Sequence, residues 1–396
     1  MQENQVAHVK LGTNRKIVQS VSEIPQNDWN LVAENRNVYL SLAYLSALES
    51  ALADKMDFRY VISYAENGEP VLISVYQLVV FVDKRRQYSS DLCKLSYHIH
   101  KKISDVFTIN VLVCGNVFCD GENGFLWRSI TAHQAMDEVG AITESLKQEA
   151  SIKEKSSITL FKEFWPDSTA HSDRLKKLQY RDFMIDVNMV LDFQESWKTM
   201  DDYLASMKTK FRTRAKSVYA RSKALEIRDL TSEEIGQNSV RIEQLFGNVL
   251  ENSDFSFGRL NAQAFVNFKR SLPDHFSFRG AWLGEELVGF STAFYNGKVV
   301  EANFVGLDYE FNKEYAVYQR FLFDYVDQGL IRNMAQLHLG RTAELVKSQI
   351  GALPTNMKLY AKHRKSVSNL LLKPIIQSIS PGEFELRMPF KENFTN

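Results

Sequence analysis

Two stretches of the sequence share a pattern that strongly constrains the fold: an aromatic-rich strand, a tight turn and a second apolar strand. They are FRYVISYAENGEPVLISVYQLVVF at residues 58–81 and FSFRGAWLGEELVGFSTAFY at residues 276–295. Asn67-Gly68 is a strong signal for a hairpin turn, and Gly284-Glu285 occupies the same place in the second stretch. Although hairpins alone are common, a repeat at this separation favours a duplicated α/β unit over a short solenoid repeat.

Helical patterns surround each hairpin. Residues 131–156 begin with Thr131 and Gln134 at capping-box spacing, and residues 199–226 carry apolar side chains at helical intervals. These patterns and the alternation after the second hairpin predict the α/β class with a mixed sheet, and we divide the chain into residues 1–185 and 186–396. The alternating segments are a strand at 298–308, a helix through 315–325, a strand at 334–340, a helix at 342–350 and a strand at 356–363.

The composition is that of a folded protein with no overall charge. The 396 residues include 48 Lys and Arg and 48 Asp and Glu, so any anion site must be local, and bulk affinity for DNA or membranes is disfavoured. The most apolar run, residues 71–82, is shorter than the ~20 residues of a spanning helix. We expect a cytoplasmic protein without a transmembrane segment, whose Cys93, Cys114 and Cys119 are reduced.

Three motifs in the second half, taken together and in order, carry a resemblance to a known family. A basic helix follows Trp197, Tyr203 and Leu204, a hairpin, strand and helix follow at 281–329, and a strand ending near Gly340-Arg341 precedes KSQIG at 347–351. From about residue 183 to 365 the chain resembles the Fem-type branch of the GNAT acyltransferase superfamily, including the FemAB-like acyltransferases of bacterial peptidoglycan biosynthesis. The resemblance implies tandem GNAT-like units: a degenerate one in 1–185 and an acyltransferase unit in 186–396.

The resemblance implies transfer of an acyl or aminoacyl group from a thioester or ester donor to an amine. The co-substrate would be acyl-CoA or an acyl carrier protein, with no tightly bound cofactor, and the acceptor a small-molecule, lipid or cell-wall amine. In place of the usual glycine-containing pyrophosphate loop, the chain has DYEFNKEYAVYQ at 308–319. Because glycine permits the closest approach of the backbone to a diphosphate, this difference weakens the case for acetyl-CoA in particular as the donor. The helical arm of the tRNA-using members is not visible either, so aminoacyl-tRNA is a possible but less favoured donor.

Glu301 and His338 are candidate catalytic residues on neighbouring strands. Glu301 stands in the apolar strand VVEANFVG, where burial of a carboxylate is unfavourable unless the group has a partner or a function. It is either a base that deprotonates the attacking ammonium or a partnered core or edge carboxylate. His338, between leucines in LHLGR, is either functional or a hydrogen-bonded core histidine.

Arg341 and Lys347 are the candidate catalytic cations. Arg341 follows a strand end, where α/β sheets place ligands, and its alternative role is a surface ion pair. Lys347 matches the lysine of the family's Lys-x-x-apolar-Gly element, so the resemblance implies that it faces the reacting carbonyl or a donor phosphate. Its alternative is a solvated helix lysine. Tyr318 and Tyr360 are either phenolic acids or donor-pocket walls, or simply core residues.

The segment SMKTKFRTRAKSVYARSK, residues 206–223, holds seven Lys and Arg and no acid. Its apolar residues fall on one stripe of a helix. We predict that Lys210 and Arg214 reach the mouth of the acyl-transfer cleft and hold the donor's phosphate, while Lys216 and Lys223 face solvent. A few cations suit a diphosphate or phosphopantetheine, whereas a nucleic-acid helix would carry more.

Three hypotheses follow. The sequence has no GxSxG, HExxH or P-loop motif and no carboxylate cluster spaced for a metal, and we read His98 and His100 as non-metal residues. The leading hypothesis is a metal-free N-acyltransferase with a thioester donor. The others are an aminoacyl-tRNA-dependent transferase acting on a cell-wall precursor, and a non-catalytic protein that binds phosphate or nucleic acid.

Overall fold

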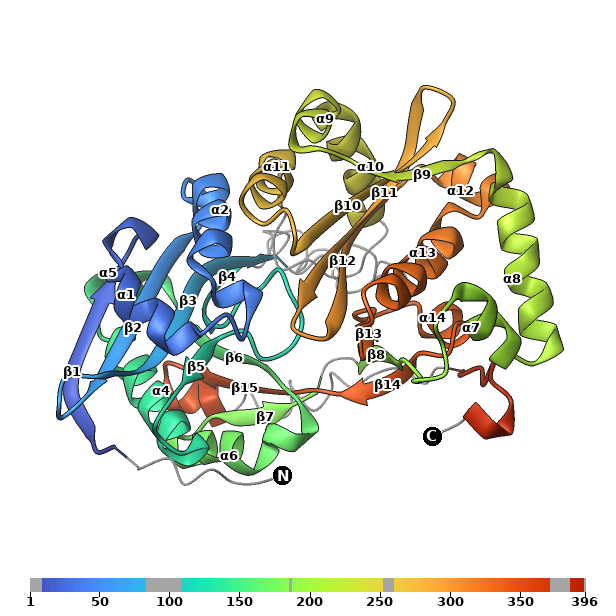
Figure 1. The fold of residues 1–396 in the computed structure, drawn as a ribbon. Helices are drawn as coiled ribbons and strands as arrows, with labels where there is room; N and C mark the ends of the chain where they lie inside the picture. Colours follow the sequence, from blue (N-terminus) through green and yellow to red (C-terminus); the bar gives the residue numbers. More distant parts are fainter. Residues whose placement is uncertain (1–8, 83–107, 185–186, 252–259, 371–384, 395–396) are drawn as a thin grey trace, which may run out of the picture.

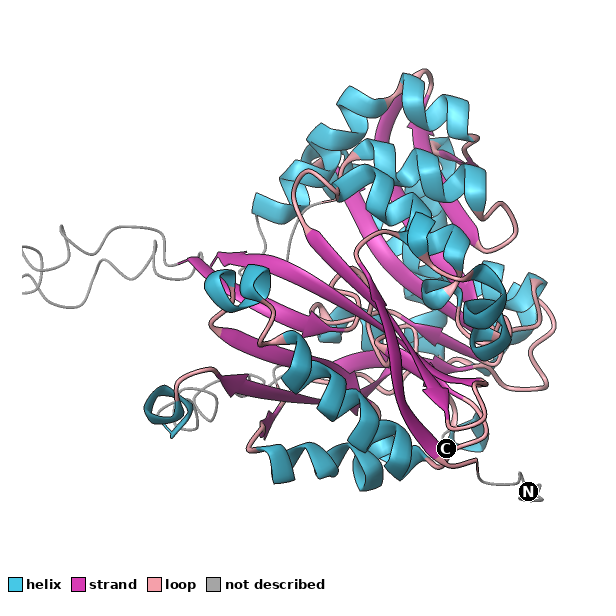
Figure 2. Cartoon of the chain, turned by 90° about the vertical axis from the view of Figure 1, so that its left-hand side faces the viewer, coloured by secondary structure: helices cyan, strands magenta, loops and turns pink. Residues whose placement is uncertain are grey.

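The computed structural model describes residues 9–82, 108–184, 187–251, 260–370 and 385–394, and Cys93, His98 and His100 lie outside these ranges. Two mixed sheets form the framework, with the strands through the middle of the molecule and helices around them (Figures 1 and 2). The first sheet has the order β1 (Leu11–Val18), β2 (Asp57–Ala65), β3 (Pro70–Val82), β4 (Thr108–Cys114), β6 (Ile158–Phe164), β15 (Lys358–His363) and β7 (Arg181–Phe183), with β5 (Phe125–Trp127) beside β3. The second has the order β9 (Glu226–Asp229), β10 (Phe276–Leu283), β11 (Glu286–Asn296), β12 (Val299–Leu307), β13 (Gln336–His338), β8 (Val187–Asp192) and β14 (Leu353–Asn356).

The two sheets have equivalent strand orders, which confirms the predicted duplication. The hairpins β2–β3 and β10–β11 are second and third in each order, and each is antiparallel. The next two strands, β4 with β6 and β12 with β13, form the parallel pair of each sheet. Gly68 and Gly284 adopt positive φ angles in the two hairpin turns, as their turn signals predicted.

Two segments cross from one sheet to the other. The chain passes from β7 in the first sheet to β8 in the second, and later from β14 in the second to β15 in the first. β8 pairs with β14 and β15 with β7, both antiparallel, so the crossing segments run side by side. In Figure 1, β15 is red among the strands of the first sheet. The chain thus changes sheet between β7 and β8, and β15 returns to the first sheet from the second half of the chain.

Helices pack on both faces of each sheet. A capping box of Thr131 and Gln134 starts α4, as the sequence predicted. Over the first sheet and beside it lie α1 (Gln26–Ala33), α2 (Leu42–Leu52), α4 (Ala132–Leu146), α5 (Ala150–Lys155) and α6 (Thr169–Ser172). With the second sheet are α7 (Met200–Ser206), α8 (Thr209–Arg221), α9 (Ser232–Gln237), α10 (Ser239–Glu251), α11 (Ala262–Ser271), α12 (Tyr309–Tyr315), α13 (Val317–Ile331) and α14 (Glu344–Ser348). None of the described helices combines the length and apolar character needed to cross a bilayer.

Residues 199–226 contain two helices, α7 and α8, which corrects the prediction of one continuous helix through this stretch. α7 ends at Ser206 and α8 begins at Thr209, because Met207 and Lys208 are extended. Met207 forms a β-bridge with Phe390, and the Lys208 amide donates to the Pro389 carbonyl at 2.8 Å. The C-terminal segment therefore captures the backbone groups that a continuous helix would use.

A continuous apolar core joins the two sheets. It includes residues of α2 and α11, which pack together, and its rings interlock across the boundary. The rings of Tyr44 and Phe268 stack at 4.9 Å, and those of Tyr39 and Phe294 lie 5.1 Å apart. Aromatic pairs of this kind add to the free energy of burial, so the two sheets form one folded body.

Candidate functional site

Glu301 is a buried carboxyl group in the middle of the second sheet. It is 8% exposed and lies on β12, between β11 and β13, so an edge position is excluded. Its Oε1 accepts a hydrogen bond from the Asn296 amide at 2.9 Å, and the Tyr39 hydroxyl also bonds to it. Burial raises the pKa of Glu301 to about 7, although both hydrogen bonds favour the charged form. The group exchanges protons near neutral pH, as a general base must.

His338 lies beside Glu301, because β12 and β13 run parallel and the two residues form the last pair of their ladder. Its Nε2 lies 3.1 Å from Oε1 of Gln336, and its ring centroid is 5.0 Å from that of Trp165. Burial lowers the pKa of His338 to about 4, so the imidazole is neutral at pH 7. Beyond this pair, residues 302–307 of β12 have β11 as their only strand partner in the described part of the chain. One edge of β12 is thus open next to Glu301.

A tight turn after β13 brings Arg341 against the first half of the chain. Gly340 has φ +69°, and a Cβ built on it would lie 2.9 Å from Oδ2 of Asp120, so glycine permits this approach. The Arg341 guanidinium forms an ion pair with Glu163 and lies 3.8 Å from Oδ1 of Asp120. Burial lowers the pKa of Arg341, and the charge of Asp120 opposes this effect. The alternative of a surface ion pair is wrong, because Glu163 is fully buried.

Lys347 is a buried cation on α14 and only 4% exposed, so the alternative of a solvated helix lysine is wrong. Its Nζ donates to the carbonyl of Gly340, at 3.2 Å, and to the carbonyl of Arg341. The lysine therefore holds the turn that carries Arg341. Burial lowers the pKa of Lys347 to about 8, against the charges of Asp120 and Glu344, which raise it.

The first half of the chain adds two buried charges from β6. Glu163 accepts hydrogen bonds from the Gly121 amide at 2.8 Å and from Nζ of Lys162 at 2.7 Å. Lys162 also donates to the Cys119 carbonyl, and burial lowers its pKa to about 8. Both side chains are almost fully buried, so these contacts replace water as their partners.

Asp120, in the loop after β4, is the common neighbour of these groups. Its negative charge acts to raise the pKa of six ionisable side chains, which shows that they lie within electrostatic range of one carboxylate. One is Cys119, and the other five are Lys162, Glu301, His338, Arg341 and Lys347. We call the latter five with Asp120 and Glu163 the charged cluster.

The charged cluster joins a proton-exchanging carboxyl group to buried cations. Asp120 and Glu163 supply carboxylates, whereas Lys162, Arg341 and Lys347 supply cations, and Glu301 is partly protonated at pH 7. This balance favours additional negative charge, such as that on a tetrahedral oxyanion. Among the described residues no group of three or more His, Cys, Asp or Glu side chains is arranged to hold a metal ion.

The four predicted donor-binding residues do not share one site, although Lys210 and Arg214 lie one turn apart on α8. Both of these side chains are exposed, but Arg214 extends into a pocket beside α13 and α14, whereas Lys210 does not line that pocket. Tyr318 lies near the start of α13, where burial and the charge of Glu344 raise its pKa. Tyr360 is fully buried on β15 in the first sheet, and its hydroxyl donates to Oδ1 of Asp173 at 2.6 Å. This environment favours the core alternative for Tyr360.

The residues from the first half were not singled out from the sequence, although one signal for them exists. Lys162 and Glu163 occur in the apolar strand SSITLFKEF, where the argument applied to Glu301 holds equally. Asp120 and Tyr39 carry no such signal. Asp120 lies in CDGENG, which looks like an ordinary turn, and Tyr39 is one of 16 tyrosines.

Comparisons with solved structures place the fold. No family model matches the sequence, and no curated protein does so either. FemX is similar with a TM-score of 0.54 and 10% identity over 91% of this chain and 100% of FemX. The C-terminal domain of a protein from Agrobacterium fabrum, named as a putative lysylphosphatidylglycerol synthetase, has a TM-score of 0.50 and 10% identity over 91% of this chain and 97% of that domain. A tandem GNAT protein of clavulanic acid biosynthesis has a TM-score of 0.48 and 9% identity over 88% of this chain and 98% of that protein.

The predicted fold resemblance and the predicted mixed α/β class are both confirmed, because FemX matches along its whole length and two equivalent mixed sheets are present. The chain therefore has the fold of FemX, built from two mixed sheets of equivalent strand order.

Proposed function

We propose that the protein is an acyltransferase that moves an acyl group from a thioester donor, acyl-CoA or an acyl carrier protein, to an amine. The observation that carries the proposal is Glu301, a buried carboxyl with a pKa of about 7 beside the cations of the charged cluster. The fold likeness to FemX agrees with the acyl transfer that the Fem-type resemblance implies. The open edge of β12 next to Glu301 supports an extended donor that bears amide groups, since such a group can hydrogen-bond to a free strand edge.

In the proposed reaction the acceptor enters as an ammonium ion. Ionised Glu301 takes a proton from it, and the amine nitrogen attacks the carbonyl carbon of the donor. As the carbon–nitrogen bond forms, negative charge develops on the carbonyl oxygen, where Lys347 and Arg341 stabilise it. The intermediate collapses with loss of the thiolate. Overall, a thioester and an ammonium ion give an amide, a thiol and one proton.

An aminoacyl-tRNA donor is the second candidate. The same residues would act, and the leaving group would be an ester oxygen in place of a sulfur. The observation that favours it is the basic segment at 206–223, whose seven cations form no ion pair with any described acid. The third hypothesis, a non-catalytic phosphate-binding or nucleic-acid-binding protein, remains the outcome if no turnover exists.

The decisive experiment combines donor screening with one substitution. Thermal-shift measurements with acyl-CoA, acyl carrier protein and aminoacyl-tRNA identify the donor, because a ligand that binds only the folded state stabilises it. With that donor and a panel of amines, we expect Glu301→Gln to lower kcat by about 10²–10⁴-fold, the usual contribution of a general base. The wild-type rate should rise with pH through about 7, because ionised Glu301 is the active form.

The matched control is Cys114→Ala. Cys114 forms the last pair of the parallel ladder in the first sheet, where Glu301 stands in the second. We expect this variant to keep the wild-type kcat. Wild-type turnover by Glu301→Gln, with donor binding intact, would reject Glu301 as the base.

A further inference from the structure

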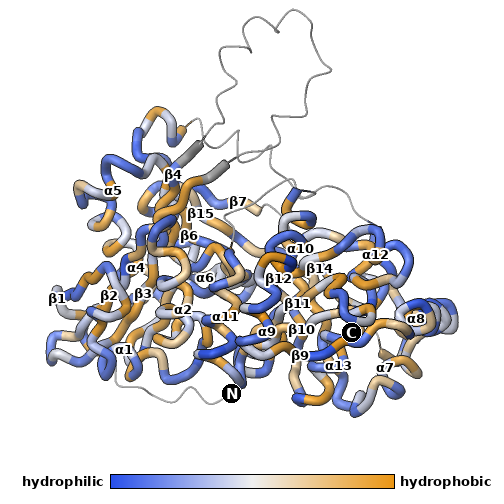
Figure 3. The backbone as a smooth tube through the Cα atoms, turned by 90° about the horizontal axis from the view of Figure 1, so that it is seen from above, coloured by the Kyte–Doolittle hydropathy of each residue, from blue (hydrophilic) through white to orange (hydrophobic). Residues whose placement is uncertain are grey.

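The basic helix α8 is not neutralised by the part of the molecule that the structure describes. The side chains of Lys210, Arg212, Arg214 and Lys216 make no ion pair or hydrogen bond with any described residue. α8 lies at the outside of the second sheet and is largely hydrophilic in Figure 3. Unpaired cations repel one another on a helix, so such a group is most stable when an anion is present.

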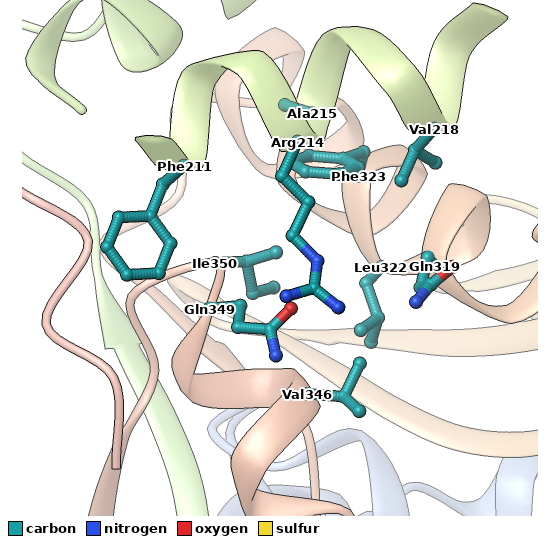
Figure 4. A pocket seen from close by; sticks show the side chains of 10 residues that line it. All are labelled: Phe211, Arg214, Ala215, Val218, Gln319, Leu322, Phe323, Val346, Gln349 and Ile350. Carbon is teal, nitrogen blue, oxygen red and sulfur yellow. The ribbon is translucent and has the colours of Figure 1, made fainter. Parts of the chain in front are cut away.

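One of these cations differs from its neighbours because it enters a pocket. The pocket is a partly open hollow whose empty space, open solvent included, is about 310 Å³, and Arg214 extends into it from α8 (Figure 4). In Figure 4 its guanidinium end lies next to Gln349 of α14, and Gln319 of α13 lies on the far side of Leu322. No acid is among the ten lining residues, and the apolar ones are Phe211, Ala215, Val218, Leu322, Phe323, Val346 and Ile350.

This chemistry matches a phosphate group. A guanidinium offers a planar fork of donors that binds phosphate through two hydrogen bonds, and the amides of two glutamines add further donors. Arg214 is an exposed side chain, so the apolar walls exclude water from only part of its surroundings and strengthen the attraction to that extent. The absence of any acid leaves the charge of Arg214 available to the ligand.

The position of the pocket links it to the charged cluster. Val346, Gln349 and Ile350 of α14 line the pocket, while Lys347 of the same short helix bonds to the turn that carries Arg341. A molecule held at Arg214 therefore lies one helix away from the cluster. Residues 308–319 contain no glycine, so side chains are better placed than backbone amides to hold a phosphate here.

We propose that Arg214, Gln319 and Gln349 form a binding site for a phosphate group of the transferase's donor. The identity of the ligand as a donor rests on the proposed function, whereas phosphate binding itself does not. A phosphate occurs in the phosphopantetheine part of CoA or a carrier protein and also in the terminal nucleotides of tRNA. The site accepts the chemistry that these sources share.

Direct binding measurements test the site without any need for turnover. The probes are pyrophosphate, CoA, pantetheine and the 5′-phosphorylated trinucleotide CCA, each titrated calorimetrically into the full chain at low and high salt. We expect Arg214→Ala to weaken binding of the phosphate-bearing probe by about tenfold or more, since a hydrogen-bonded charge is lost. Pantetheine, which lacks phosphate, should bind the variant and the parent alike. CoA and CCA separate the two donor sources.

The matched control is Lys216→Ala, which removes an exposed cation of the same helix outside the pocket. Its affinity for the probes should stay within about twofold of the parent, because a surface charge acts weakly and is screened by salt. Arg214→Lys should recover only part of the affinity, because it keeps the charge and loses the fork. The double variant Gln319→Ala/Gln349→Ala should also bind more weakly.

Three results would overturn the site: no phosphate-bearing probe binds the parent, Arg214→Ala binds them as the parent does, or Lys216→Ala loses as much as Arg214→Ala. The last would indicate a diffuse positive field. If binding depends on Arg214 but no donor supports turnover, the proposed function fails while the phosphate site stands.

Discussion

The two sheets share one strand order but place different side chains at the end of their parallel ladders. In the first sheet the last pair of that ladder is Cys114 with Phe161, and in the second it is Glu301 with His338. Cys114, Phe161 and Glu301 are buried, and His338 is half-buried. The first is a thiol whose pKa burial raises and an aromatic ring, whereas the second holds a carboxyl group that exchanges protons near pH 7. At the same position of one topology, the first sheet therefore lacks a group that exchanges protons near neutral pH, whereas the second sheet has one.

The first half nevertheless contributes to the chemistry proposed for the second. Its loop after β4 and its strand β6 bring Asp120, Lys162 and Glu163 against Arg341. The crossing strands β8 and β15 fix the two sheets relative to each other, which keeps this contact in register. The comparison indicates that a duplicated unit can lose its own reactive pair and still supply charged residues to its copy.

The sharpest way to break this comparison is to remove the ion pair that joins the halves. Arg341→Ala leaves the Glu163 carboxylate, fully buried, without one of its cations. We expect a loss of about 3–5 kcal/mol in the free energy of unfolding, the usual cost of breaking a buried pair. Urea denaturation measures it.

The control is Arg174→Ala, which removes an ion pair with Asp137 within the first half. Both partners are partly exposed, so the loss should be at most about 1 kcal/mol. Equal losses for the two variants would mean that the contact between halves adds no special stability.

The pKa values of Glu301 and Glu144 are shifted in opposite directions, so substitutions at the two residues should have opposite effects on the free energy of unfolding. The folded-state pKa of Glu301, raised to about 7 by burial, makes the wild type lose stability as pH rises from about 4.5 to 7. Glu301→Gln removes that loss, so we expect it to be more stable than the wild type by roughly 1–3 kcal/mol at pH 8, with the difference disappearing near pH 4. Thermal or urea unfolding across pH measures this.

Glu144 in the first half should behave in the reverse way. Burial opposes the effect, but hydrogen bonds from Lys147, Lys362 and Tyr180 lower the pKa of Glu144. Its stabilisation is present above the unfolded pKa and is lost as pH falls. Glu144→Gln should therefore be less stable than the wild type at neutral pH, and this deficit should shrink in acid. A parallel pH response of both variants would contradict the assigned causes.

Two glycines separate backbone strain from contact between the halves. Gly284, in the second hairpin, has φ +60° and open space where an added methyl group would lie, whereas Gly340 has φ +69° and faces Asp120. Alanine at either position should cost about 1–2 kcal/mol of stability through the left-handed backbone. Only Gly340→Ala should also lower kcat, because Asp120 must shift. Equal kcat values for the two variants would remove Asp120 from the proposed site.

The fold was largely predictable because local patterns fix hairpins, caps and the alternation after residue 296. Thr131 with Gln134 began a helix as predicted, and both glycine turns formed. The route of β15 was not predictable, because an apolar strand pattern does not name its partner strand. The break at Met207 and Lys208 was also missed, since it depends on pairing with a segment near residue 390.

The candidate site was predictable only where a charge interrupts an apolar strand or follows its end. Glu301, Arg341 and Lys347 met that condition and lie together around Asp120. Asp120 came from a turn whose sequence gives no hint of its neighbours, and only the packing of the two halves reveals its role. For Tyr360 the packing favours the alternative of a core residue, because its ring belongs to the apolar core of the first sheet and aromatic residues fill cores more often than they line sites.

Tyr360 and Tyr318 provide the mildest test of the comparison. Of these two predicted donor-binding tyrosines, Tyr360 lies in the first sheet and Tyr318 lies on α13 beside the second sheet. Hydrogen bonds from Tyr360 and from lysines lower the pKa of Asp173 to about 2, although burial opposes them. Tyr360→Phe should cost about 1 kcal/mol at neutral pH, the value of one hydrogen bond, and leave KM for the donor unchanged. Because the pKa of Asp173 is depressed in the folded state, this cost should fade as pH drops toward 2. The matched variant is Tyr318→Phe, because Tyr318 lies beside Gln319 of the proposed phosphate pocket. Its KM for the donor is compared with that of Tyr360→Phe. A raised KM in Tyr360→Phe with unchanged stability would return Tyr360 to the donor site and remove it from the core.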